Sequence, residues 1–303
     1  MEEIFYSNGK LLITAEYLVL EGAKALALPT KFGQNLIVNN GKNKEIIWES
    51  YDCDGSIWFK EVILFSDISD EKKLEIESEK NTLIKILREA YFLNPNFIKK
   101  SEGYLIKTNL TFPKHWGLGT SSTLINNIAQ WLKIDAFDLL KNSFGGSGYD
   151  IACARNNFPI LYQLKDEKPI VKKVNFKPVF KDHLYFVYLN QKQSSKSAVL
   201  FYFNKKNDVS KIIPSINEIT LTILKTQEFD VFTTQLNNHE KLMSKVLELP
   251  TVKENLFSDF DGGIKSLGAW GGDFALVFSK DNPSNYFIGK GFNTIMPYSE
   301  MIL

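Results

Sequence analysis

The stretch that decides the fold class of this chain is YLIKTNLTFPKHWGLGTSSTLINNIAQWL, residues 104–132. From Tyr104 to Leu110 apolar and polar residues alternate, which predicts a strand. Leu124, Ile128 and Leu132 repeat at helical spacing, which predicts a helix. Between the two lies GLGTSS, Gly117 to Ser122, so the order is strand, glycine-rich loop, helix.

This order predicts a site for a chain of phosphates. A glycine-rich turn at a helix start offers backbone N–H groups and the positive end of the helix dipole. Gly117 and Gly119 permit close backbone approach, Ser121 and Ser122 can add hydroxyl donors, and a hydroxyl at the helix start can also ligate the Mg²⁺ that travels with ATP. The alternative is an ordinary turn followed by a helix cap. The loop matches neither the Walker A pattern nor a dinucleotide fingerprint.

Three further motifs carry chemically useful groups. Lys10 follows Ser7-Asn8-Gly9 and precedes Glu16-Tyr17; Asp150 ends the run GGSGYD; and Asp273 ends the run GAWGGD. Each has a plain alternative, because a lysine can extend to solvent, an aspartate can cap a helix and a glycine run can form a hairpin. Their joint occurrence and order favour a functional site.

Composition excludes several functional classes. The chain has 303 residues, 44% of them hydrophobic, with 36 basic and 35 acidic side chains. No basic stripe indicates nucleic-acid binding. No apolar run predicts a membrane span and no signal peptide is evident, so we expect a cytoplasmic protein. Cys53 and Cys153 are too few for a disulfide framework or a zinc site, and Cys153 is expected to be buried.

The rest of the chain predicts a mixture of strands and helices. Strands are expected between Phe5 and Leu28, with turns at Ser7-Asn8-Gly9 and Glu21-Gly22, and again over residues 46–65, 160–164 and 184–189. Asn81 is expected to cap a helix that ends before Pro95. Helices are expected at 215–224 and 233–249. The charged stretch 71–80 predicts a solvated loop or helix start, and the polar stretch 165–182 a domain boundary.

The four motifs together resemble those of the GHMP kinases, the superfamily of galactokinase, homoserine kinase, mevalonate kinase and phosphomevalonate kinase. GKLLITAEYLVLEG at Gly9 to Gly22 resembles the first motif, GLGTSS the ATP-binding second motif, and LGAWGGD at Leu267 to Asp273 the third. The resemblance implies an α+β fold with two domains. Residues 1–170 would form an ATP-binding domain like ribosomal protein S5 domain 2, and residues 171–303 a ferredoxin-like domain.

The resemblance also implies roles for individual residues. Lys10 and Asp150 would be catalytic, with Lys10 stabilising developing charge and Asp150 acting on the acceptor. The cofactor would be ATP with Mg²⁺, and Ser122 would be the metal ligand. ATP would be held by Gly117, Leu118, Gly119, Thr120, Ser121 and Ser122. The acceptor would be held by Glu16, Ser147, Gly148, Tyr149, Ser194, Ser195, Lys196, Gly271, Gly272 and Asp273.

Within the superfamily, Ala15-Glu16-Tyr17, Trp116 and the run GSGYDIA are similar to the phosphomevalonate kinase branch. Phosphomevalonate of the mevalonate pathway is therefore the predicted acceptor. Lys192, Lys196 and Arg155 could meet the phosphate that this acceptor already bears. Mevalonate, a sugar or an amino-acid hydroxyl are alternatives, and a catalytically silent ligand-binding regulator is the alternative of another class. A homodimer is left open.

Overall fold

The computed structural model describes residues 2–70, 78–205 and 207–303, with only the backbone described at Ser195. They form two compact units. Unit 1 comprises the segment ending at Gly9, Phe32–Lys114 and Gly119–Arg155; unit 2 comprises Lys10–Lys31, His115–Leu118 and Asn156–Leu303. Both units are discontinuous in sequence, and a single division at residue 170 stays a prediction.

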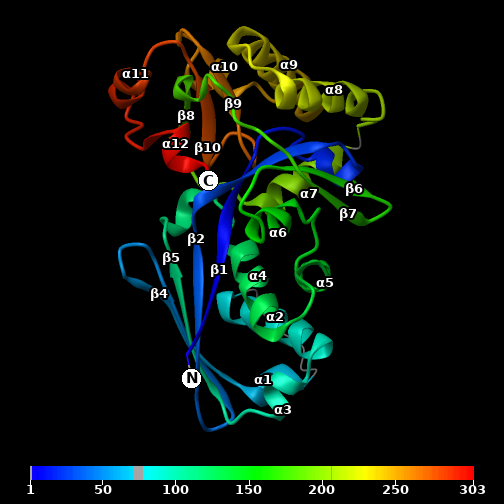
Figure 1. The fold of residues 1–303 in the computed structure, drawn as a ribbon, viewed down its shortest axis with the longest axis vertical. Coiled ribbons are helices and arrows are strands. Elements are labelled where there is room, and N and C mark those ends of the chain that lie inside the picture. Colours follow the sequence, from blue (N-terminus) through cyan, green and yellow to red (C-terminus); the bar gives the residue numbers. More distant parts are fainter. Residues whose placement is uncertain (1, 71–77, 206) are drawn as a thin grey trace. The chain divides into compact units, whose positions relative to one another are not determined.

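A twisted sheet forms one layer of unit 1 (Figure 1). Its strand order is β4 (Ile57–Leu64), β3 (Glu45–Tyr51), β5 (Tyr104–Leu110) and β2 (Ala25–Asn40), with β1 (Glu3–Leu12) also paired to β2. β3 runs parallel to β5, and β5 is antiparallel to β2. Because side chains alternate across a sheet, Leu36, Trp48 and Ile106 share a buried face.

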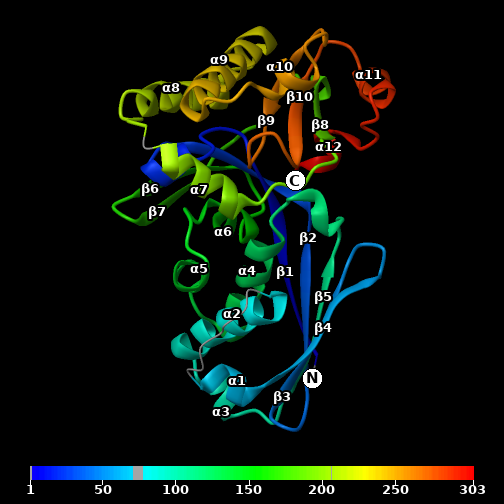
Figure 2. The same cartoon turned by 180° about the vertical axis from the view of Figure 1, so that it is seen from behind.

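Helices cover that buried face, as Figure 1 and, from behind, Figure 2 show. They are α1 (Phe65–Ser69), α2 (Glu79–Leu93), α3 (Asn96–Lys99), α4 (Thr120–Leu132), α5 (Ala136–Ser143) and α6 (Tyr149–Ala154). α4 turns Ile125 and Ile128 into the core, and α6 contributes Ile151. The starts of α4 and α6 therefore belong to helices that are anchored by core residues.

Unit 2 contains two groups of strands. The N-terminal end of β2 pairs with β6 (Ile160–Lys165), and β6 in turn pairs with β7 (Lys168–Lys173). A separate antiparallel sheet has the order β11 (Ile295–Pro297), β8 (Leu184–Tyr188), β10 (Phe274–Phe278) and β9 (Gly263–Ser266). Phe274 lies opposite Tyr188, so the loop before β10 and the loop after β8 meet at one end of this sheet.

The helical segments of unit 2 are η1 (Leu18–Glu21), η3 (Lys181–His183), α7 (Ser195–Lys205), α8 (Ile212–Lys225), α9 (Phe229–Leu247), α10 (Val252–Leu256), α11 (Ser284–Gly289) and α12 (Tyr298–Met301). α8 and α9 lie side by side in both views (Figure 1, Figure 2), and α9 packs against β9. Within the described ranges, no helix combines the length and apolar character needed to cross a bilayer.

The α+β fold class and the strand at 104–110 are confirmed. The predicted helix is present, but it begins at Thr120, inside GLGTSS, so only the first three residues of this run form the loop. The predicted turn at Ser7-Asn8-Gly9 is wrong, because β1 runs through it. Ser7 is buried and exchanges hydrogen bonds with Asn126 and Asn127 of α4, so tertiary partners satisfy these polar residues within a strand.

Asn81 is not the cap of α2. The Ser78 hydroxyl caps the helix by accepting from the Asn81 N–H at 3.1 Å, so the helix begins at Glu79. Of the charged stretch 71–80, residues 71–77 lie outside the described residues. The stretch 165–182, expected as a boundary, contains β7.

Candidate active site

The glycine-rich loop follows β5 and a short helical turn at Lys114–Trp116, and its residues are shared between the two units. Gly117 and Leu118 belong to unit 2, as does Lys10. The Lys10 N–H donates to the Leu118 carbonyl at 2.9 Å, and its ammonium Nζ donates to the Gly117 carbonyl at 3.2 Å. The predicted catalytic lysine thus lies directly on the predicted phosphate loop.

The Asp273 carboxylate also packs against Gly117. A Cβ atom at Gly117 would come within 2.3 Å of the Asp273 carboxylate, and Gly117 has a φ of +69°. Both features require glycine. The Asp273 backbone is fixed by its N–H donating to Gln191 at 2.7 Å and by its carbonyl accepting from Leu189 at 2.8 Å. Asp273 itself holds a φ of +54°, so this carboxylate is placed by a strained backbone.

Burial and the neighbouring groups shift the pKa of the Asp273 carboxyl in opposite directions. Burial raises the pKa of the Asp273 carboxyl, while the charge of Lys10, the N–H of Gln193 and the charge of Lys192 lower it. The Gln193 N–H donates to Oδ1 at 3.3 Å. Two lysines therefore act on one partly desolvated carboxylate beside the loop, an arrangement suited to holding anionic groups.

In unit 1, Gly119 begins α4 with a φ of +99° and, among the described residues, with no side chain capping the helix. The first N–H groups of such a helix have no intrahelical partner, so they can bind an anion. The Ser122 side chain is buried and donates to the Gly119 carbonyl at 2.9 Å, while Ser121 is exposed and Thr120 half-buried. Because this hydroxyl is a donor in that bond, the lone pairs of the Ser122 oxygen remain available to a cation.

The second glycine run of unit 1 leads into α6. Gly148, with a φ of +85°, is its N-cap, and Asp150 lies in the first turn. Asp150 is therefore not the cap itself. Its Oδ1 accepts from the Ile151 N–H at 3.0 Å, and Ser147, Tyr149 and Asp150 are all half-buried. The carboxylate is positioned in the first turn of a short helix whose Ile151 is packed in the core of unit 1.

The segment after β8 lies beside the third glycine run in unit 2. A Cβ atom at Gly272 would come within 2.0 Å of Gln193 Cγ, so the two loops are in contact. Ser194 and Lys196 are exposed, and the Ser194 oxygen accepts from the Ser197 N–H at 3.3 Å. The side chain of Ser195, another predicted acceptor contact, lies outside the described residues. Gly271 has a φ of +79°.

Glu16 occupies a different environment from the one expected for an acceptor contact. Only 2% of it is exposed, and its Oε1 lies 2.5 Å from Nζ of Lys265, which is fully buried. His239 and Glu240 of α9 lie beside this pair. The sequence reasoning missed these three residues, although a lysine within the short apolar strand GIKS was a signal.

The residues present offer few ligands to a metal. No group of three or more His, Cys, Asp or Glu side chains suited to a metal ion occurs in the part of the chain that the structure describes. Asp135, one of the two acidic residues between Ser122 and Asp150, caps α5 by accepting from Phe137 and Asp138. This donor set would suit a Mg²⁺ ion whose remaining ligands come from water or from a phosphate-bearing ligand, with the Ser122 hydroxyl as a candidate protein ligand.

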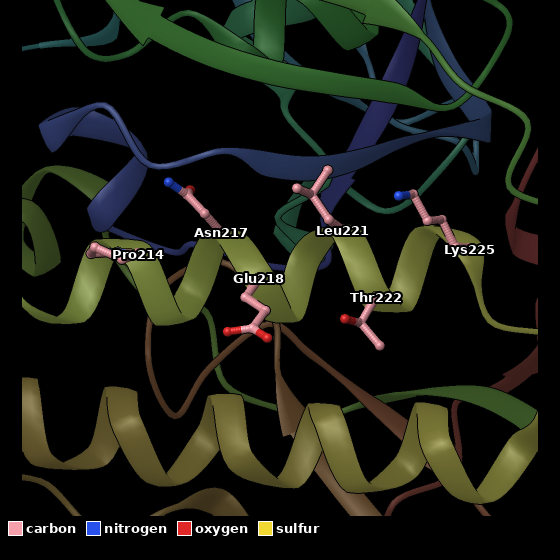
Figure 3. A pocket seen from close by; sticks show the side chains of 6 residues that line it. All are labelled: Pro214, Asn217, Glu218, Leu221, Thr222 and Lys225. Carbon is pink, nitrogen blue, oxygen red and sulfur yellow. The ribbon is translucent and has the colours of Figure 1, made fainter.

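Two hollows in unit 2 contain none of these candidate residues. The smaller, of about 430 Å³, is lined by six residues of α8 (Figure 3). The larger, of about 810 Å³, is lined by residues that include Lys173, Lys177 and Tyr298. The candidate residues lie instead in the glycine-rich runs and in the elements next to them, with Lys10 in β1, Ser122 in α4 and Asp150 in α6.

No protein-family model matches the sequence, and no curated protein matches it either. Solved structures do match in fold. The mevalonate kinase of Methanococcus jannaschii superposes with a TM-score of 0.69 at 14% identity, over 98% of this chain and 97% of that one. The phosphomevalonate kinase of Streptococcus pneumoniae, solved with phosphomevalonate and AMPPNP, gives 0.67 at 17% identity, over 99% and 98%.

A D-glycero-D-manno-heptose 1-phosphate kinase from Bacteroides thetaiotaomicron gives a TM-score of 0.66 at 15% identity, over 100% of this chain and 96% of that one. The chain therefore has the GHMP kinase fold along nearly its whole length. At these identities the likeness establishes the fold and leaves the acceptor open.

Proposed function

We propose that this chain, which has the GHMP kinase fold, is an ATP-dependent small-molecule kinase that phosphorylates phosphomevalonate. The observation that carries the proposal is the arrangement at Gly117. The Lys10 ammonium contacts the carbonyl of this residue, and the Asp273 carboxylate packs against its Cα position. A fixed positive charge thus lies on the loop predicted to hold the ATP phosphates.

Phosphoryl transfer needs positioning and charge neutralisation more than covalent chemistry. In the proposed reaction the backbone and hydroxyl groups of Gly117, Leu118, Gly119, Thr120, Ser121 and Ser122 hold ATP. Ser122 would help to hold Mg²⁺ on the bound ATP, where the ion would neutralise phosphate charge. Lys10 stabilises the charge that develops on the transferred group, and Asp150 orients or deprotonates the acceptor hydroxyl.

The lysines near the loops support phosphomevalonate as the proposed acceptor. Phosphomevalonate carries a phosphate and a carboxylate, so its site needs fixed positive charge. The charge of Lys192 lowers the pKa of the Asp273 carboxyl, and the exposed Lys196 lies a few residues further along the chain. Ser147, Gly148, Tyr149, Ser194, Ser195, Gly271, Gly272 and Asp273 are the other proposed acceptor contacts. The second candidate is mevalonate, whose single charge needs fewer cations.

The test is an ADP-release assay with Mg-ATP and phosphomevalonate, mevalonate, homoserine, galactose or a heptose 1-phosphate as acceptor. We expect the highest kcat/KM with phosphomevalonate. Turnover of another acceptor alone would correct the substrate and leave the kinase assignment intact. ATP binding without turnover of any acceptor would favour the silent ligand-binding regulator.

A further inference from the structure

We propose that Glu16, Lys265, His239 and Glu240 form a charge-balanced buried cluster that fixes the turn at Ala15–Tyr17 and, through Tyr17, the loop Gly268–Gly272. Glu16 is then a positioning residue and not an acceptor contact. The proposal rests on the proposed function only for its kinetic consequence. We call these four residues the buried ion cluster.

The cluster is enclosed in unit 2. Lys265 and His239 are fully buried, and Glu16 and Glu240 are 2% and 3% exposed. Lys265 Nζ lies 2.5 Å from Glu16 Oε1 and 3.6 Å from Glu240 Oε1, and it also donates to the Ser266 carbonyl at 2.8 Å. A bulky acceptor does not reach a carboxylate so deeply covered, which separates Glu16 from the exposed residues of the loops.

The turn beside the cluster is strained. Ala15 and Tyr17 have φ values of +66° and +62°, a region that residues with a Cβ rarely adopt. Such a backbone persists only where its surroundings determine it. The Ala15 N–H donates to His239 Nε2 at 2.9 Å, and Glu16 between the two strained residues is held by Lys265. The cluster supplies the contacts that keep the turn in place.

Tyr17 connects this turn to the third glycine run. The Trp270 N–H donates to the Tyr17 hydroxyl at 2.8 Å, and the Tyr17 ring stacks on Tyr202 of α7 at 5.4 Å. Gly268 and Gly271 on either side of Trp270 have positive φ values and no neighbour near a Cβ position. The loop is held at Trp270, whose indole N–H also donates to the Pro250 carbonyl at 3.0 Å, and at Gly272, which packs against Gln193. A shift at Tyr17 therefore acts directly on the loop through Trp270.

The buried ion cluster is electrically neutral only if one of its two carboxyl groups is protonated. Because its Nε2 accepts a hydrogen bond, His239 is neutral with its proton on Nδ1, and burial lowers its pKa well below the usual value. Burial raises the pKa of Glu16, although Lys265 opposes this, and burial raises the pKa of Glu240 to about 7. Lys265 Nζ lies closer to Glu16 than to Glu240, so the ion pair is placed between Lys265 and Glu16 and the proton on Glu240, which leaves the cluster without net charge.

The groups that face Glu240 are few. Lys265 and Ser266 face it from β9 and Glu16 from the turn, with the Ser266 hydroxyl donating to Oε2 at 3.3 Å. α8, packed beside α9, contributes no charge that acts on Glu240 among the described residues. Above pH 7 Glu240 ionises and leaves an uncompensated negative charge inside unit 2, which weakens the cluster.

The first test compares the pH dependence of thermal unfolding in the wild type, Glu240→Gln and Glu228→Gln. Glu228 is exposed at the start of the same helix and serves as the control. A raised carboxyl pKa contributes stability below the unfolded value of 4.5 that is lost as pH rises to about 7. Relative to the wild type, Glu240→Gln should gain about tenfold in the folding equilibrium for each pH unit in that window, and Glu228→Gln should not.

The second test measures amide hydrogen exchange at pH 6 in Lys265→Met and in Glu16→Gln/Lys265→Met. The single variant leaves Glu16 buried without its cation, so exchange should accelerate at least tenfold in peptides covering residues 13–19 and 266–273, with little change in unit 1. The double variant removes both charges and should recover most of the protection. Equal protection in all three proteins, or a profile of Glu240→Gln parallel to the wild type, would overturn the proposal.

A kinetic readout separates the positioning role from substrate contact. In Glu16→Gln we expect kcat to fall while KM for the acceptor stays within about twofold, because the variant disturbs the loop without touching the substrate. A large rise in acceptor KM alone would make Glu16 a contact. If the wild type has no kinase activity, the proposed function fails, while the exchange and unfolding tests still decide on the cluster.

Discussion

Two separate features restrict position 117 to glycine. Its φ of +69° disfavours any residue with a Cβ, and the Asp273 carboxylate occupies the space that a Cβ would fill. The same glycine offers its carbonyl to Lys10. The loop, the lysine and the aspartate therefore depend on one another, and a change at Gly117 disturbs all three.

The variant Gly117→Ala should lower the free energy of unfolding through both effects. Strain at positive φ costs about 1–2 kcal/mol, and overpacking against Asp273 adds about 1–3 kcal/mol. Gly145→Ala is the matched control, because its φ of +71° is similar and no atom lies within 4 Å of its Cβ position. Urea unfolding of both variants checks this. Equal losses in the two variants would contradict the contact with Asp273.

Asp150 is the residue whose proposed role lies in the chemical step. The variant Asp150→Asn keeps the shape of the side chain and its acceptor for the Ile151 N–H while removing the charge. We expect kcat to fall about 10²-fold or more, with the Kd for AMPPNP changed less than about twofold. Calorimetric titration together with the ADP-release assay measures both quantities. Parallel loss of affinity and turnover would assign Asp150 a structural role.

At the scale of the element, the start of α4 has no side-chain cap and carries two adjacent serines, one buried and one exposed. Ser122 is 3% exposed and bonded to Gly119, whereas Ser121 is exposed. Helix geometry turns the two side chains to different sides of the helix, since successive residues are about 100° apart. The two serines should therefore differ in what they contribute.

We expect Ser122→Ala to raise the Mg²⁺ concentration needed for half-maximal turnover several-fold and to lower stability by about 1 kcal/mol, because a buried hydrogen bond is lost. Ser121→Ala should weaken AMPPNP binding without changing stability. Magnesium titrations at fixed ATP and thermal unfolding of both variants provide the measurements. Indistinguishable effects of the two substitutions would refute separate roles for the hydroxyl groups.

At the scale of the whole molecule, the proposed nucleotide site is assembled from residues that lie far apart in the sequence. Lys10, Gly117 and Asp273 meet within unit 2. A ligand that binds such a site stabilises the folded chain by mass action, because the unfolded chain offers no comparable site.

Mg-AMPPNP should therefore raise the apparent unfolding temperature in a concentration-dependent way. At a ligand concentration of 100 times Kd the stabilisation is about 2.7 kcal/mol. Differential scanning fluorimetry with Lys10→Met as the comparison measures it, and we expect a smaller shift in that variant. An unchanged unfolding temperature of the wild type at millimolar Mg-AMPPNP would argue against nucleotide binding.

Local features of the fold were predictable from the sequence, because they depend on residues close together in the chain. Alternation predicted β5, helical spacing predicted α4, and glycine at positions of positive φ marked the loops between them. The resemblance of four short motifs predicted the GHMP fold that the solved structures share. The turn predicted at Ser7-Asn8-Gly9 failed because Ser7 finds its partners on α4.

The sequence by itself thus determined the α+β class, the order of strand, glycine-rich loop and helix, and the candidate set around Lys10, Gly117 and Asp150. Only the tertiary structure decided that Asp273 packs on Gly117 and that Glu16 pairs with Lys265. The physical reason is that both contacts join residues far apart along the chain. Charge and burial act through space, so no local pattern around Glu16 indicates which cation will lie beside it.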